Sequence, residues 1–79
     1  MNWLDYIEQR PDIMLGKPVF KGTRLTVELI LERLGQGAPE DDLLAAYPTL
    51  RREHIRAALA YAAAALSSDE TIFLTERAG

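Results

Sequence analysis

The stretch PEDDLLAAYPTLRREHIRAALAYAAAAL, residues 39–66, decides the fold that the sequence predicts. Pro39 suits the first position of a helix, and the three acidic residues after it lie where negative charge offsets the helix dipole. Pro48 ends that helix, and a longer helix is expected from about Arg51 to Leu66. Two helices joined by a tight turn at residues 48–50 match a helix-turn-helix. From the local pattern alone they match an ordinary helical hairpin equally well.

Three arginines open the longer helix, and a second basic segment lies nearer the N-terminus. In a helix-turn-helix the N-terminal residues of the second helix face the major groove of DNA, where arginine binds phosphate or the edge of guanine. The net charge of −3 argues against a simple basic binder. Charge attraction is screened within about 8 to 10 Å, however, so local basic segments can act in an acidic chain. We predict DNA contacts by Arg52 and Arg56, supported by Arg51, Lys17, Lys21 and Arg24.

The residues before Pro39 predict one more helix and a small β element. Thr26 can cap a helix from Val27 to Leu34, whereas prolines and glycines between residues 11 and 22 forbid a helix there. Val19-Phe20 is expected to be a short strand. The predicted fold class is therefore mainly α with a small β element, in one domain. Its parts are an N-terminal arm with short strands at 1–26, a three-helix body with the helix-turn-helix at 27–66, and a C-terminal extension at 67–79.

A helical wheel of residues 51–66 divides the longest helix into two apolar faces. One face, which we expect in the core, carries Ile55, Leu59, Ala62 and Leu66. The opposite face carries Ala57, Ala60 and Ala64, and such small side chains let another helix approach closely. We predict a homodimer through this alanine face, because a 79-residue chain without disulfides has only a thin core.

The run Thr71–Thr75 is apolar and β-prone and follows a polar break. We predict that it adds a strand to a partner protein, with Ile72, Phe73 and Leu74 as the contact residues. Folding back onto the N-terminal β element, of the same chain or of a dimer mate, is an almost equal alternative.

Catalytic and metal chemistry find little support in the sequence. There is no cysteine, and the only histidine, His54, resembles a surface residue on a helix flank, so neither a metal site nor a cofactor is expected. The segment Gly16–Thr23 has its lysine in the wrong place for a phosphate-binding loop. The apolar run at residues 57–66 is about half of the roughly 20 residues that span a membrane. We therefore expect a cytoplasmic protein that is not an enzyme.

Three segments carry a family resemblance: RPDIMLGKPVFKGTRLTV at residues 10–27, AYP at 46–48, and IRAALAYA at 55–62. Together they closely resemble the bacterial family called domain of unknown function 433, whose members are regarded as VapB-like antitoxins with a helix-turn-helix fold. The resemblance implies a partner toxin related to PIN-domain nucleases, and repression of the chain's own operon by binding operator DNA. The rival hypothesis is a protein-interaction module with the same fold and little or no DNA binding.

One residue departs from the family pattern. Arg51 stands where the family usually has threonine or serine, which would cap the longest helix. Losing such a cap costs about 1 kcal/mol unless another group replaces it. Thr49 could do so if the helix starts earlier, so the start of the helix and the direction of Arg52 are left open.

Overall fold

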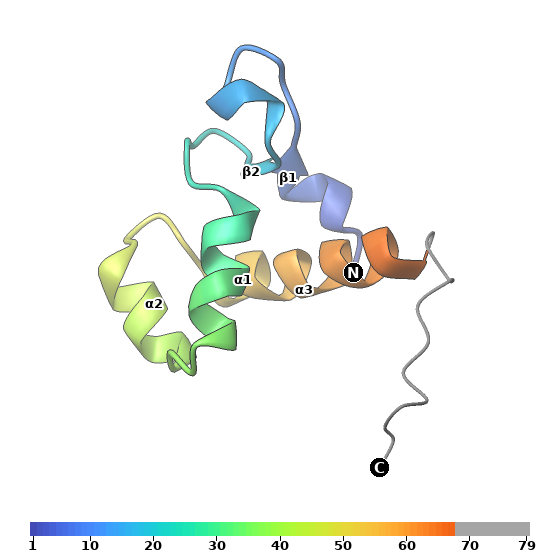
Figure 1. Cartoon of the computed structure of the whole chain (residues 1–79). Helices are drawn as coiled ribbons and strands as arrows, with labels where there is room; N and C mark the ends of the chain where they lie inside the picture. The colour runs from blue at the N-terminus through green and yellow to red at the C-terminus, as the bar shows by residue number, and fades with distance from the viewer. Residues whose placement is uncertain (68–79) are drawn as a thin grey trace.

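Residues 1–67 are described by the structure, a computed structural model. Three α-helices follow a two-stranded sheet and two short 3₁₀ turns (Figure 1). This confirms the predicted mainly α fold with a small N-terminal β element. The elements in chain order are η1 (Trp3–Asp5), β1 (Ile7–Glu8), η2 (Met14–Gly16), β2 (Val19–Phe20), α1 (Val27–Gly35), α2 (Glu40–Ala46) and α3 (Arg52–Ser67).

The sheet is a short antiparallel hairpin in which Ile7 pairs with Phe20 and Glu8 with Val19. Between the strands a loop at residues 9–18 projects away from the helices (Figure 1). Its backbone is left-handed at Met14, Leu15 and Gly16, and the Leu15 side chain is 96% exposed.

The turn that leads from β2 to α1 is closed by Thr23. Its Oγ1 donates to the Phe20 carbonyl at 2.8 Å and accepts from the Leu25 N–H at 3.0 Å. Gly22 takes a φ of +77° in this turn. Thr26 then caps α1 as predicted, because its Oγ1 accepts from the backbone N–H of Leu29 at 3.2 Å.

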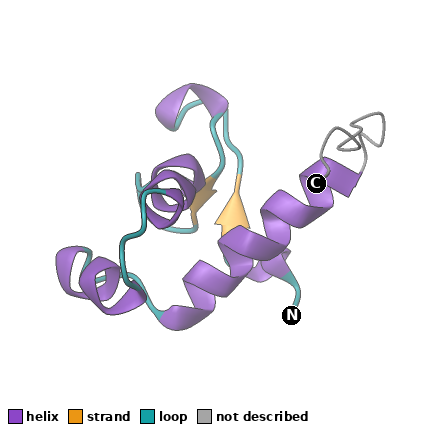
Figure 2. Ribbon diagram, turned by 60° about the horizontal axis from the view of Figure 1, so that its bottom comes forward, coloured by secondary structure: helices purple, strands orange, loops and turns teal. Residues whose placement is uncertain are grey.

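The core lies where α3 crosses the sheet and α1. Figure 2 shows the sheet and α1 on the same side of α3, and the largest fully buried side chains come from these three elements: Phe20, Ile30 and Ile55. The N-terminal turn η1 also packs on α3, since the rings of Trp3 and Tyr61 meet edge to face with centroids 5.0 Å apart. The ends of the chain segment 1–67 are therefore held together by aromatic packing.

The buried face of α3 differs from the prediction. Ala57, expected on the outer face, is fully buried at 0% exposure beside Ile55 and Ala58. Leu59 and Leu66, expected in the core, are 50% and 61% exposed. Compared with the prediction, α3 is therefore rotated about its axis. Its partners pack against the side that carries Ala57 and Ala58, where small side chains let the backbones come closest.

No helix within residues 1–67 is both long enough and apolar enough to cross a membrane.

Candidate nucleic-acid interface

The segment from α2 to α3 has the connectivity of a helix-turn-helix. Pro39 lies at the N-cap of α2, one position earlier than predicted, and the backbone N–H of Tyr47 closes the helix by bonding to the Leu43 carbonyl at 3.0 Å. In the turn, the Leu50 N–H donates to the Tyr47 carbonyl at 2.8 Å, and the Leu50 side chain is buried in the core. A buried anchor in the turn fixes the start of α3 relative to α2.

His54 determines how α3 begins. The helix starts at Arg52, and the backbone N–H of the preceding residue, Arg51, donates to His54 Nδ1 at 2.9 Å. This is the bond that a glutamate or glutamine makes in a capping box, in which the third helical residue reaches back to the N-cap. His54 thus supplies one of the two hydrogen bonds of a capping box. This bond offsets the absence of threonine or serine at position 51, whose side chain would supply the other. His54 performs this role where the sequence suggested Thr49.

Aromatic packing holds the His54 ring in place. Tyr6 and Phe20 each meet it edge to face, with centroids 5.4 Å away. Burial against these rings lowers the pKa of His54, because it disfavours the charged form. The neutral ring can accept at Nδ1, as the bond to Arg51 requires. His54 is therefore a structural residue and not the surface histidine that the helix pattern suggested.

Arg52 is held by the first turn of α2. Its guanidinium lies 3.0 Å from Glu40 Oε1 and 2.5 Å from Asp41 Oδ1. The hydrogen bond and charge of Asp41, followed by those of Glu40, raise the pKa of Arg52. The acidic cluster of α2 thus does more than offset a helix dipole: it cross-links the two helices and neutralises one of the predicted DNA-contacting arginines.

The other predicted basic residues lie in three places. Arg51 and Arg56 are exposed at the start of α3, and within residues 1–67 neither forms an ion pair. Lys21 and Arg24 are also exposed, in the turn after Phe20, whose ring contacts His54. Lys17 lies apart from them, because its Nζ pairs with Glu28 of α1 at 3.1 Å. The structure therefore brings Arg51, Arg52 and Arg56 together but assigns Lys17 to another surface.

The predicted dimer and partner-binding residues have different outcomes. Ala57 cannot line an outer face because it is buried, whereas Ala60 is half-buried and Ala64 exposed. Ile72, Phe73 and Leu74 lie outside the described residues. Within residues 1–67 no three histidine or acidic side chains are grouped as metal ligands would be.

Comparison with known proteins places this fold in a family. A family model described as a protein of unknown function, DUF433, matches residues 7–62. The chain belongs to the DUF433 family. The match begins at β1 and ends in α3, so this DUF433 domain includes the hairpin, α1, α2, the turn and α3 as far as residue 62.

Two relatives extend this finding. The DUF433 chain is 37% identical over 60 residues to an uncharacterized protein, y4eO, of Sinorhizobium fredii. These aligned residues make up 76% of this chain but only 27% of that protein. The chain therefore spans about a quarter of that relative's length. The crystal structure of a DUF433 member protein from Anabaena variabilis matches with a TM-score of 0.67 and 36% identity, over 70% of this chain and 55% of that one.

Proposed function

We propose that this chain is the antitoxin-like component of a bacterial toxin–antitoxin pair. In this proposal it binds operator DNA through the start of α3 and a PIN-related toxin through a second surface, acts in the cytoplasm and performs no catalysis. The observation that carries the DNA-binding part is a pair of exposed arginines, Arg51 just before α3 and Arg56 in its second turn, which form no ion pair with any other residue of 1–67.

Two features support this assignment over an ordinary helical hairpin. The turn is anchored by the buried Leu50, and the first turn of α3 is fixed by the bond from Arg51 to His54. A recognition helix needs such fixed geometry, because base contacts depend on the direction of a few side chains.

A specific observation also favours the rival, a protein-interaction module without DNA binding. Arg52 is neutralised by Glu40 and Asp41, so it offers a phosphate less charge than the sequence suggests. Glu53 adds exposed negative charge next to Arg52 in the sequence, and Asp42 adds it next to Asp41. If this acidity prevails, the chain binds only its protein partner.

DNA binding is tested with the purified chain and its own upstream DNA, using fluorescence anisotropy at several salt concentrations. Arg56→Ala should weaken binding and, for a phosphate contact, lower the salt slope by about one unit. Arg10→Ala is the matched control, because it removes the same charge from the β hairpin, where Arg10 pairs with Asp12. An equal loss of DNA binding in both variants, or no loss in either, would favour the interaction module.

The toxin-binding part is tested separately. Co-expression of this chain with the product of the adjacent reading frame should protect cells, and the two proteins should copurify. Copurification with lost DNA binding in Arg56→Ala would show that the two functions use different surfaces. A neighbouring product that neither harms cells nor copurifies would contradict the antitoxin proposal.

A further inference from the structure

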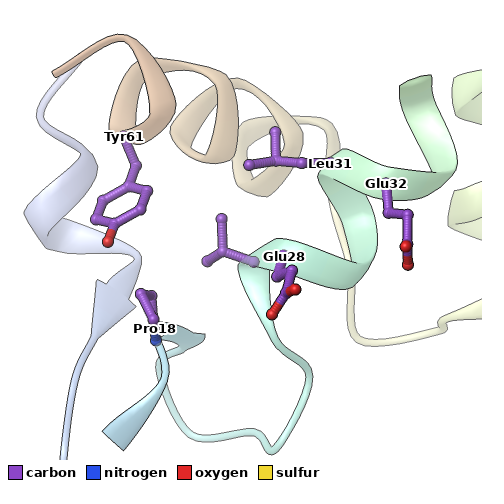
Figure 3. Close-up of a pocket in the computed structure, with 6 residues that line it drawn as sticks. Pro18, Glu28, Leu31, Glu32 and Tyr61 are labelled. Atoms are coloured by element: carbon purple, nitrogen blue, oxygen red, sulfur yellow. The ribbon is translucent and has the colours of Figure 1, made fainter. Parts of the chain in front are cut away.

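A groove of about 510 Å³ opens at the junction of α1, α3 and the start of β2. Figure 3 shows Tyr61 reaching from α3 toward Pro18, and Leu31 lying between α1 and α3. The floor is apolar, while two carboxylates of α1 lie along one side. The lining residues are Pro18, Val27, Glu28, Leu31, Glu32 and Tyr61.

The Tyr61 ring is a fixed wall of this groove. Its edge-to-face contact with Trp3 at 5.0 Å holds the ring from behind. The Tyr61 hydroxyl makes no hydrogen bond with any other residue of 1–67. The wall therefore offers an apolar face and one polar atom to a ligand, and little ordering is needed to present them.

The charge of the groove is negative. Glu28 and Glu32 are exposed four residues apart on α1, where like charges repel. Lys17 pairs with Glu28 at 3.1 Å, but both side chains are more than half exposed, so a competing cation can replace Lys17 readily. Glu32 has no ion pair within residues 1–67. A cationic group next to Glu32 would relieve the repulsion.

This surface is separate from the start of α3. Tyr61 follows Arg56 by five residues, which places the two side chains about 140° apart around α3, and it follows Arg51 by ten residues, which is about 15 Å along the helix axis. A ligand in the groove would leave Arg51 and Arg56 accessible.

We propose that this groove binds a basic, amphipathic segment of a partner protein. An apolar side chain of that segment lies on Val27, Leu31 and Tyr61, and a lysine or arginine beside it pairs with Glu32 and displaces Lys17 from Glu28. Charge complementarity selects a basic segment over an acidic one, and the apolar floor selects a protein segment over a hydrophilic polycation. The proposal does not depend on the antitoxin assignment.

The test uses the full chain and a labelled peptide of alternating leucine and arginine, followed by fluorescence anisotropy. Glu28→Gln combined with Glu32→Gln should weaken binding about tenfold, since two exposed charge pairs are lost. Leu31→Ala should weaken it by a similar factor through lost apolar contact. Glu53→Gln is the control, because Glu53 is an exposed carboxylate at the start of α3 and should leave the affinity unchanged.

Several outcomes would overturn the proposal. They are absence of peptide binding, an affinity unchanged by the two glutamine substitutions, or an equal loss in Glu53→Gln, which would mean attraction to net charge alone. In the free chain, NMR contacts from the Tyr61 ring to residues 71–75 would show that the chain itself fills the groove. Concentration-dependent shifts of the Leu31 methyl groups without peptide would show that a second copy does. The glutamine variants remain informative if Leu31→Ala fails to fold, since both substituted residues are exposed.

Discussion

His54 Nδ1 accepts the backbone N–H of Arg51 at 2.9 Å, so the start of α3 depends on a side chain that titrates. The same ring packs against Tyr6 and Phe20, which belong to the N-terminal hairpin region. One residue thus links the helix start to the sheet.

Stability should therefore depend on pH through His54. Its folded pKa is lowered by burial from the ordinary 6.5, against the smaller raising effect of Glu53, so the unfolded chain binds the proton more tightly. The stabilisation is fully present above about pH 6.5 and is lost as the pH falls through the lowered folded pKa. Protonation also turns the Nδ1 acceptor into a donor that faces an N–H.

Thermal melts between about pH 5 and 8 measure this effect. Wild-type Tm should fall with pH below the ordinary histidine pKa. His54→Gln, which can accept the same bond but does not titrate, should have a flatter profile. Identical profiles for the two proteins would show that the cap does not titrate in this range.

Arg52→Ala should weaken DNA binding less than Arg56→Ala. The reason is that Glu40 and Asp41 already neutralise Arg52, whereas Arg56 has no ion pair within residues 1–67. Conversely, Glu40→Gln with Asp41→Asn should tighten binding by releasing the guanidinium. Anisotropy titrations of the four proteins decide the matter, and a larger loss in Arg52→Ala than in Arg56→Ala would be inconsistent with the ion-paired geometry.

Gly22→Ala should destabilise the fold through backbone strain alone. Gly22 has a φ of +77°, and nothing lies within 4 Å of an added Cβ, so a steric clash does not contribute. A left-handed non-glycine residue costs roughly 1–2 kcal/mol, which lowers Tm by about 4–8 °C per kcal/mol in a small domain.

Gly35→Ala is the matched control for this substitution. Gly35 also has open space around an added Cβ, but its φ is not positive and it ends α1. Alanine there should leave Tm unchanged or raise it, because alanine favours helix. Equal Tm losses at the two glycines would refute the strain explanation.

If the chain forms a homodimer through α3, Leu59→Glu should weaken the dimer more than Ala64→Glu. Leu59 is 50% exposed and shares its side of the helix with Leu66, whereas Ala64 presents only a methyl group. Sedimentation equilibrium measures the difference. A monomeric wild-type chain at high concentration would contradict the dimer hypothesis. A larger weakening of the dimer by Ala64→Glu than by Leu59→Glu would favour the alanine face as the interface.

Local signals were sufficient for much of the fold. Thr26 capped α1 as expected, and the helix begins at Val27 as predicted. The β2 strand also formed at Val19-Phe20. Each of these features depends on neighbours within a few residues, which a sequence pattern contains.

The features that were missed depend on contacts between distant residues. Seven alanines are spread around all sides of α3, so they do not indicate which side is buried. The helical wheel therefore gave too much weight to the larger Leu59 and Leu66, which are exposed. The ring contacts of His54 and the ion-pair partners of Arg52 lie in other elements. Only the spacing of three residues between Arg51 and His54, which is that of a capping box, could have indicated the cap. The groove is invisible to local patterns because Pro18, α1 and Tyr61 meet only in the fold.

The contact between Trp3 and Tyr61 also constrains when the domain can form during synthesis. The first aromatic ring leaves the ribosome long before the second has been added. At about 5–20 residues per second the N-terminal turn and hairpin wait several seconds for α3, and until then their apolar side chains are uncovered. During that interval the nascent chain offers a chaperone an apolar surface that the finished domain hides.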